Sequence, residues 1–201
     1  MIDFTGKKVL IVSDTHFGHK KMVASSEDRF ERIRRYNTTD EMDQDIIDRW
    51  NEQVDSSTVV IFLGDFLMNC PIKETSDRVH FLLHKLNKPA EFYWIVGNHD
   101  HVIRKKVPDI HMQRYITFKY KGRTYFAQHY GFSEDEFGYD DKILNELIEN
   151  GEHFDVLVHG HTHSDQKVSK TNRADEYQYQ NCVCWDAWYR LVDPAELRSA
   201  Q

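Results

Sequence analysis

The stretch that decides the fold class is Lys8-Val9-Leu10-Ile11-Val12, followed directly by Ser13-Asp14-Thr15-His16. Four apolar residues in a row indicate a strand that is buried on both faces, as the strands of parallel sheets are. The polar residues after Val12 predict a loop at the carboxyl end of this strand. The side chains able to do chemistry therefore begin where the first predicted strand ends.

The same arrangement recurs along the chain. Apolar stretches at residues 58–63, 91–96 and 154–158 each precede a polar loop, and these loops are Gly64-Asp65, Gly97-Asn98-His99-Asp100 and His159-Gly160-His161-Thr162-His163. A capping-box sequence from Thr38 to Glu41 predicts the start of an amphipathic helix. A second helical stripe contains Val79, Leu82, Leu83 and Leu86. Strands alternating with helices predict an α/β fold.

The second half of the chain adds a predicted hairpin. Residues 114–120 and 123–129 form its two strands around Lys121-Gly122, because glycine tolerates the positive φ of a tight turn. Further predictions are a helix at 141–150, a strand at 177–184 and a helical turn at 193–197. Since no repeat, linker or low-complexity stretch interrupts the chain, we expect one domain spanning residues 1–201.

Composition narrows the classes of function. The 201 residues include 26 Lys and Arg against 33 Asp and Glu, a net charge of −7, which argues against binding of long nucleic acids. Three cysteines cannot complete a disulfide framework, and the early apolar run is too short for a signal sequence or a membrane span. We therefore expect a cytoplasmic protein without a membrane partner. The 12 histidines outnumber the 9 glycines, which indicates a use for imidazole.

Possible metal ligands and proton-transfer groups gather after the predicted strands, at Asp14, His16, Asp65, Asn98, His99, His129, His161 and His163. In α/β sheets the carboxyl ends of the strands meet at one edge, so these side chains are expected to lie together. Mixed Asp, Asn and His ligands suit divalent transition metals, with manganese favoured and iron, zinc or nickel as alternatives. The set exceeds what one tetrahedral ion uses, so two ions sharing a bridging carboxylate fit better.

In this order and spacing the motifs resemble the signature of the calcineurin-like metallophosphoesterases. The matching blocks extend from residue 14 to residue 163 and are Asp14-x-His16, Gly64-Asp65, Gly97-Asn98-His99-Asp100, His129 and Gly160-His161-x-His163. Residues 181–192, with Asn181, Tyr189 and Arg190, are also similar to small single-domain bacterial and phage members. The resemblance implies a four-layer αββα sandwich of two mixed β-sheets flanked by helices.

The resemblance also implies a role for each matching residue. Asp14, His16 and His163 would bind a first metal, whereas Asn98, His129 and His161 would bind a second, and Asp65 would bridge the two. His99 would orient or protonate the leaving-group oxygen, with Asp100 as its possible supporting partner. The implied nucleophile is a hydroxide that bridges the two metals.

This interpretation predicts a phosphoesterase acting on a small phosphodiester, such as a cyclic nucleotide or another nucleotide-derived ester. A phosphomonoesterase or protein phosphatase is the alternative within the family. Such relatives carry arginine after Gly-Asp and before Gly-Asn-His, where this chain has Phe66 and Val96. A non-catalytic protein-binding scaffold is the alternative outside enzymology, although no motif ligand is missing. The sequence does not predict the natural substrate or the oligomeric state.

The remaining candidates have two interpretations each. His19 and His101 are expected to be solvated loop residues rather than substrate contacts, and His80 and His84 to be a helix-surface pair, whereas His159 stays open between the site and the sheet interior. The basic residues Arg29, Arg32, Arg34 and Arg35 either bind phosphate or form a solvated helix face. Residues 130–141 could act as a lid. The two thiols of Cys182-x-Cys184 are expected to pack in the interior.

Overall fold

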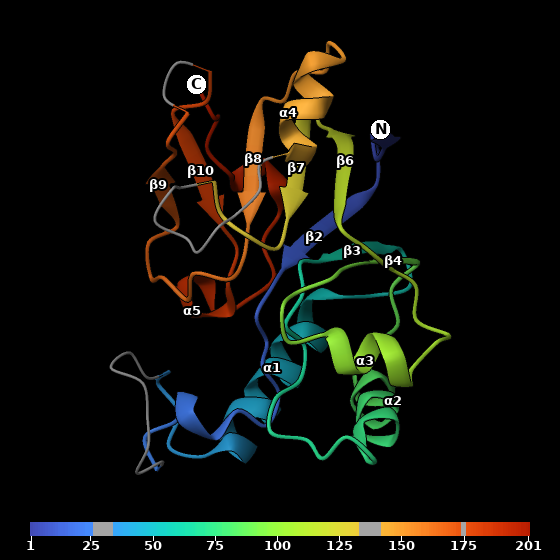
Figure 1. The fold of residues 1–201 in the computed structure, drawn as a ribbon. Helices are drawn as coiled ribbons and strands as arrows, with labels where there is room; N and C mark the ends of the chain where they lie inside the picture. The colour runs from blue at the N-terminus through green and yellow to red at the C-terminus, as the bar shows by residue number, and fades with distance from the viewer. Residues whose placement is uncertain (26–33, 133–141, 174–175) are drawn as a thin grey trace.

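The computed structural model describes residues 1–25, 34–132, 142–173 and 176–201 (Figure 1). Its strands are β1 Ile2–Asp3, β2 Lys8–Val12, β3 Thr58–Phe62, β4 Glu91–Ile95, β5 Met112–Gln113, β6 Tyr115–Tyr120, β7 Arg123–Gln128, β8 Val156–His159, β9 Val168–Lys170 and β10 Tyr179–Cys182. Its helices are α1 Thr39–Gln53, α2 Thr75–Lys85, α3 His101–Lys106, α4 Lys142–Glu149 and α5 Trp185–Trp188. Two 3₁₀ turns, Lys20–Met22 and Pro194–Glu196, complete the set.

The strands form two sheets. One has the order β2-β3-β4-β5 with every pairing parallel, and we call it the parallel sheet. The other has the order β1-β6-β7-β8-β10-β9 and combines parallel with antiparallel pairs, and we call it the mixed sheet. The resemblance implied that both sheets are mixed. Among the described residues, the antiparallel component of the parallel sheet is an isolated bridge between Ile11 and Val192.

The two sheets pack face to face, and helices cover their outer faces (Figure 1). Alternate residues of β2 show this directly, because Val9 and Ile11 enter the core between the sheets whereas Leu10 and Val12 pack on the side of α1 and α2. Likewise Val156 of β8 faces the parallel sheet, and Leu157 faces α4. The expected four-layer αββα sandwich is therefore confirmed.

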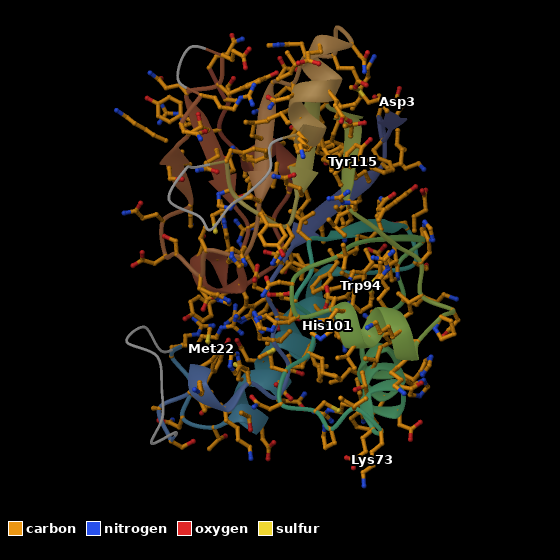
Figure 2. All side chains as sticks on the ribbon, viewed as in Figure 1. Asp3, Met22, Lys73, Trp94, His101 and Tyr115 are labelled. Atoms are coloured by element: carbon orange, nitrogen blue, oxygen red, sulfur yellow. The ribbon has the colours of Figure 1, made fainter. Side chains whose placement is uncertain are left out.

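Side chains fill all of these layers (Figure 2), with Trp94 packed among the helices of the parallel sheet and Tyr115 on the outer face of the mixed sheet.

The predicted start of α1 is correct in part. Thr38 accepts a hydrogen bond from the Glu41 backbone N–H at 3.2 Å, but the Glu41 carboxylate reaches the N–H of Asn37 at 2.8 Å instead of that of Thr38. Within the described residues, no helix has the length and apolar character needed to cross a membrane.

Candidate metal centre

The proposed ligands come from five loops that follow strands of both sheets. Asp14 and His16 follow β2, Asp65 follows β3, and Asn98 follows β4, all at the carboxyl edge of the parallel sheet. From the mixed sheet, His129 follows β7, and His161 and His163 follow the parallel neighbour β8. The structure brings these residues together as two candidate metal-binding groups, Asp14, His16, His163 and Asp65, His129, His161.

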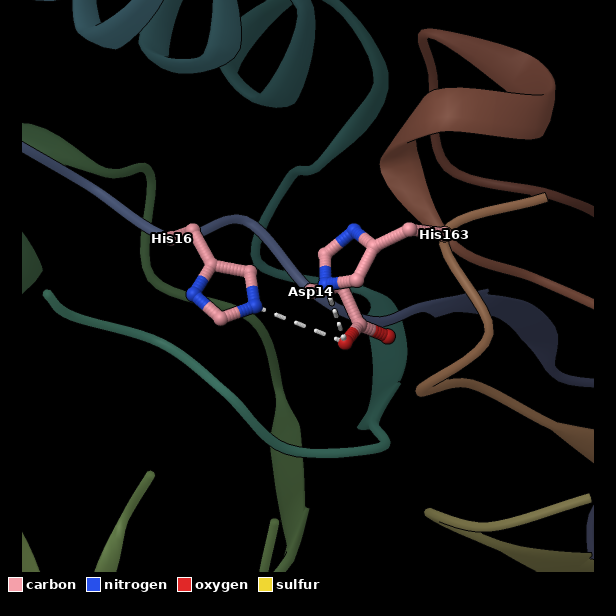
Figure 3. A group of neighbouring side chains, drawn as sticks. All are labelled: Asp14, His16 and His163. Carbon is pink, nitrogen blue, oxygen red and sulfur yellow. Dashed lines mark ion pairs between the residues drawn. The ribbon is translucent and has the colours of Figure 1, made fainter. Parts of the chain in front are cut away.

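The first group has its donor atoms directed at a common point (Figure 3). The Asp14 Oδ1 atom lies 3.6 Å from Nε2 of His16 and 3.6 Å from Nε2 of His163. Asp14 Oδ1 and both ring nitrogens of His16 are buried, and in the part of the chain that the structure describes they have no hydrogen-bond partner. Since a buried polar atom without a partner is costly, these atoms fit a bound cation.

Asp65 connects the two groups. Its Oδ2 atom lies 3.5 Å from Nε2 of His16 and 3.5 Å from Nε2 of His129, so one carboxylate oxygen faces a histidine of each group. The His129 Nδ1–H donates to the Leu63 carbonyl at 2.6 Å, which leaves Nε2 as the ligand atom, 3.0 Å from Oδ1 of Asn98. Asn98 thus approaches the second group as the resemblance implied.

Asp14 and Asp65 each direct one carboxylate oxygen at the site, while the other oxygen accepts hydrogen bonds that fix the side chain. Asp14 Oδ2 accepts hydrogen bonds from the His161 backbone N–H at 2.9 Å and from the Cys184 thiol at 3.2 Å. Asp65 Oδ1 accepts from the His99 backbone N–H at 2.8 Å. The orientation of both carboxylates is therefore set by the loops themselves.

The backbone at the ligands is strained. Asp14, His16, Asp65, His161 and His163 all have positive φ, between 48° and 65°. Non-glycine residues rarely adopt this left-handed conformation, and each instance costs on the order of 1 kcal/mol or more. Such a concentration of strain is typical of functional sites, where the surrounding structure imposes the conformation.

Charges of the ligand side chains compensate one another. Burial opposes a charge on His129, but the carboxylates of Asp65 and Asp14 outweigh it and raise the pKa of His129 to about 9. Burial also opposes ionisation of Asp14, yet the neighbouring histidines, His16 first, hold the pKa of Asp14 well below its usual range. A protonated imidazole thus supplies the positive charge that these carboxylates require.

His99 lies at the edge of the centre, whereas Asp100 lies behind it. The His99 ring is half-buried with its centroid 5.4 Å from that of His16, and it lines a pocket of about 170 Å³. The Asp100 carboxylate is fully buried and accepts hydrogen bonds from the backbone N–H groups of Asp65, Phe66 and Gly97 and from the indole of Trp94. Asp100 therefore fixes the loops that carry Asp65 and Gly97, and its role as a supporting partner of His99 stays a prediction.

Two further expectations need correction. His19 is not a solvated loop residue, because it is only 6% exposed, its ring centroid lies 5.2 Å from that of His16, and burial lowers its pKa to about 3. Arg34 neither binds phosphate nor lies on a solvated face. It is buried, and its guanidinium is occupied by the Asp186 carboxylate and by backbone carbonyls.

His101, His80 and the two thiols lie as the sequence predicted, and the structure also places His159. His159, left open by the sequence, is buried against Phe132 in the mixed sheet, and burial lowers its pKa to about 4. His101 is exposed, and His80 pairs on the surface with Asp109 at 3.2 Å. Cys182 and Cys184 are buried. Arg29, Arg32 and residues 133–141 of the suggested lid lie outside the described residues.

Sequence reasoning missed two residues that contact the proposed ligands. Asp186 of α5 accepts a hydrogen bond from Nδ1 of His163 at 2.9 Å, and Cys184, selected only for packing, donates to Asp14. Both follow β10, beyond the motifs, and the only signal was the weak similarity of residues 181–192 to small family members. A groove of about 430 Å³ around Trp50, Leu86 and Phe92 lies at the opposite end of the parallel sheet and contains none of the proposed ligands.

The fold and the two ligand groups define an α/β metalloprotein with its site at the carboxyl edge of the strands. Comparison with known families is specific, because residues 8–181 match the calcineurin-like phosphoesterase superfamily domain, and the chain belongs to that superfamily. Its members typically bind divalent metals, and the ligand groups of this chain fit that chemistry.

The similar proteins include archaeal and phage sequences. The uncharacterized protein MJ1445 of Methanocaldococcus jannaschii is 26% identical, with 87% of this chain and 76% of that protein covered. The Gene 66 protein of Mycobacterium phage D29 is 27% identical, with 94% of each chain covered. Among solved structures, the protein of unknown function AQ665 from Aquifex aeolicus has a TM-score of 0.64 at 20% identity and covers 94% of this chain and 96% of its own, which shows a shared fold.

Proposed function

We propose that the chain is a dimetal phosphodiesterase that hydrolyses a small phosphoester, such as a cyclic nucleotide or another nucleotide-derived diester. The observation that carries this proposal is the position of Asp65 Oδ2, 3.5 Å from a histidine nitrogen of each ligand group. Two ions sharing one carboxylate is the arrangement that serves phosphoryl transfer. Manganese is the favoured metal, and the cytoplasmic location stays a prediction.

The protein residues divide the work. Asp14, His16 and His163 would hold one ion, Asn98, His129 and His161 the other, and Asp65 both. When bound, the ions polarise the phosphoryl oxygens and lower the pKa of water, which supplies the nucleophile. His99, beside the first group, would donate a proton to the oxygen of the leaving alcohol.

The surroundings favour a diester over a monoester. A phosphomonoester carries about two negative charges near neutral pH, and arginine forks are the usual partners for them. Here Phe66 is packed in the core, while Arg34 and Arg35 form ion pairs with Asp186 and Asp45. The pocket of about 170 Å³ beside His99 suits a compact leaving group.

Metal analysis combined with hydrolysis of two generic esters tests the proposal. We expect the purified protein to bind two equivalents of Mn²⁺ and to cleave bis-p-nitrophenyl phosphate faster than p-nitrophenyl phosphate. Asp65→Asn should abolish turnover. His99→Ala should keep both metals but slow esters with poor leaving groups more than activated esters, whereas His84→Ala, at an exposed position on α2, serves as the matched control.

Each contrary result has a defined meaning. Faster cleavage of the monoester would favour a phosphomonoesterase of the same fold. Loss of both metals from His99→Ala would show that His99 is a ligand rather than an acid. A protein that binds no Mn²⁺ and cleaves neither ester would refute the enzyme and favour a protein-binding scaffold.

A further inference from the structure

We infer that Arg34 and Asp186 form a brace that fixes the ring of His163 and the loop of Asp14 before any ion binds. The inference rests on the proposed metal centre and adds two positioning residues to it. They come from segments that lie 152 positions apart in the chain, the end of the loop before α1 and the start of α5.

The contact between Asp186 and His163 determines which ring nitrogen faces the site. Asp186 Oδ2 lies 2.9 Å from Nδ1 of His163, and a carboxylate can only accept, so the proton is on Nδ1. Nε2 then carries a lone pair directed at the site, where it lies 3.6 Å from Oδ1 of Asp14. A metal needs this lone pair, and a fixed tautomer means that the ring does not have to rearrange on binding.

Arg34 holds Asp186 and the Asp14 loop at once. Its Nε and Nη2 atoms donate to the two oxygens of Asp186, at 2.9 and 3.0 Å, in a forked arrangement. On its other side Nη1 donates to the Thr15 carbonyl at 2.7 Å, and Nη2 also donates to the Asp14 carbonyl. One planar group therefore sets the distance between α5 and the loop that carries the first ligands.

Burial makes a purely stabilising role a poor explanation. Arg34 is 1% exposed, and the side chain of Asp186 is 12% exposed, so both charges lose most of their hydration. Buried ion pairs contribute little net stability compared with apolar residues of the same size. The pair does fix the geometry of His163 and of the Asp14 loop. Cys184, two residues before Asp186, also holds this loop, because its thiol donates a hydrogen bond to the Asp14 carboxylate.

His129 of the second ligand group is oriented without this brace. The equivalent nitrogen of His129 donates to the backbone carbonyl of Leu63, which substitution of a side chain does not remove. Loss of Asp186 should therefore affect one metal site and spare the other. This selectivity distinguishes a positioning role from a general loss of folding.

The experiment uses three variants of the full chain. Asp186→Ala removes the acceptor and leaves Arg34 buried without its partner. The double variant Arg34→Met with Asp186→Ala removes both charges, so no buried charge is left unpaired while His163 still lacks its acceptor. Glu196→Ala is the matched control, because Glu196 also forms a forked carboxylate–guanidinium pair, with Arg190 on the surface.

Two measurements besides activity decide the outcome. In Mn²⁺ titrations, Asp186→Ala and the double variant should lose about 10- to 100-fold in affinity at one of two sites, and Glu196→Ala should match the parent. In ¹⁵N NMR spectra of the metal-free protein, recorded at a pH where the His163 ring is neutral, the proton should be on Nδ1 in the parent and be distributed over both nitrogens in the double variant.

The inference is overturned if the folded double variant binds Mn²⁺ as the parent does, or if its His163 tautomer is unchanged. Either result would assign the pair to folding alone. Equal weakening of both sites would also contradict it. A parent protein that binds no Mn²⁺ would refute the proposed function, yet the NMR measurement on the metal-free protein would still test the brace.

Discussion

Gly160→Ala should disable the first metal site because the added Cβ atom collides with the side chains of Ser13 and Asp14. Gly160 follows β8 directly, and a Cβ atom added there would lie 2.6 Å from Oδ2 of Asp14 and 2.8 Å from Cβ of Ser13. An ordinary contact begins near 3.4 Å, so the Asp14 carboxylate must move by about 0.8 Å. It cannot rotate away freely, because its Oδ2 atom accepts hydrogen bonds from His161 and Cys184.

Two magnitudes follow for Gly160→Ala. Overpacking of a tightly packed site lowers the free energy of unfolding by about 1–3 kcal/mol. A catalytic constellation displaced by about 1 Å loses on the order of 100-fold in rate. We expect both effects, measured by chemical denaturation of the metal-free protein and by Mn²⁺-supported hydrolysis of an aryl phosphodiester, together with weaker Mn²⁺ binding at one site.

Gly122→Ala is the control for a loss of stability that does not reach the site. Gly122 lies in the β6–β7 turn with φ +79° and has nothing within 4 Å of the added Cβ, so alanine there should cost about 1–2 kcal/mol and leave Mn²⁺ binding unchanged. If Gly160→Ala bound Mn²⁺ and turned over like the parent, the packing argument for the Asp14 loop would be refuted.

Three further outcomes test other parts of the structure. Asp100→Ala leaves three backbone N–H groups and an indole without an acceptor. It should therefore lower the free energy of unfolding, measured by denaturant titration, by about 3 kcal/mol or more. Unchanged stability with slower turnover would instead make Asp100 a partner of His99. Burial raises the pKa of Asp43 to about 6. The contribution of Asp43 to the free energy of unfolding is therefore fully present below about pH 4 and is lost as the pH rises through 6. The loss amounts to about 3 kcal/mol at pH 7. The difference in unfolding free energy between the metal-free parent and Asp43→Asn should follow this profile, and a pH-independent difference would contradict it. Because His129, with its pKa raised to about 9, must lose its proton to bind a metal, calorimetric Mn²⁺ affinity should rise at least about tenfold per pH unit from pH 7 to 9, and a flat profile would count against His129 as a ligand.

Local patterns in the sequence were sufficient for the main elements. The apolar runs at β2, β3 and β8 are buried on both sides because each of their faces meets a hydrophobic layer, which is the condition that produces such runs. The proposed ligands could be found for a related reason. Each stands directly after a strand, so its position in space follows from its position in the chain.

Contacts between distant segments could not be predicted in this way. Arg34 belongs to a run of charged residues, a pattern typical of solvated surfaces, and only its pairing with Asp186 of α5 explains its burial. His19 is buried because the β2 loop turns back on itself, which no spacing indicates. Elements such as β1, β5 and α5 contain two to four residues, too few to show a period.

The left-handed backbone at the ligand positions has an evolutionary consequence. Five ligand residues have a left-handed backbone conformation that glycine or asparagine adopts at a lower energy cost. Replacing any of them by glycine or asparagine would therefore relieve backbone strain. A lineage released from selection for chemistry would gain stability by exchanging these histidines and aspartates, one at a time. Descendants without activity would then keep the sandwich fold and lose the ligand residues first. Continued use of the site would instead preserve every motif ligand, and all of them are present in this chain.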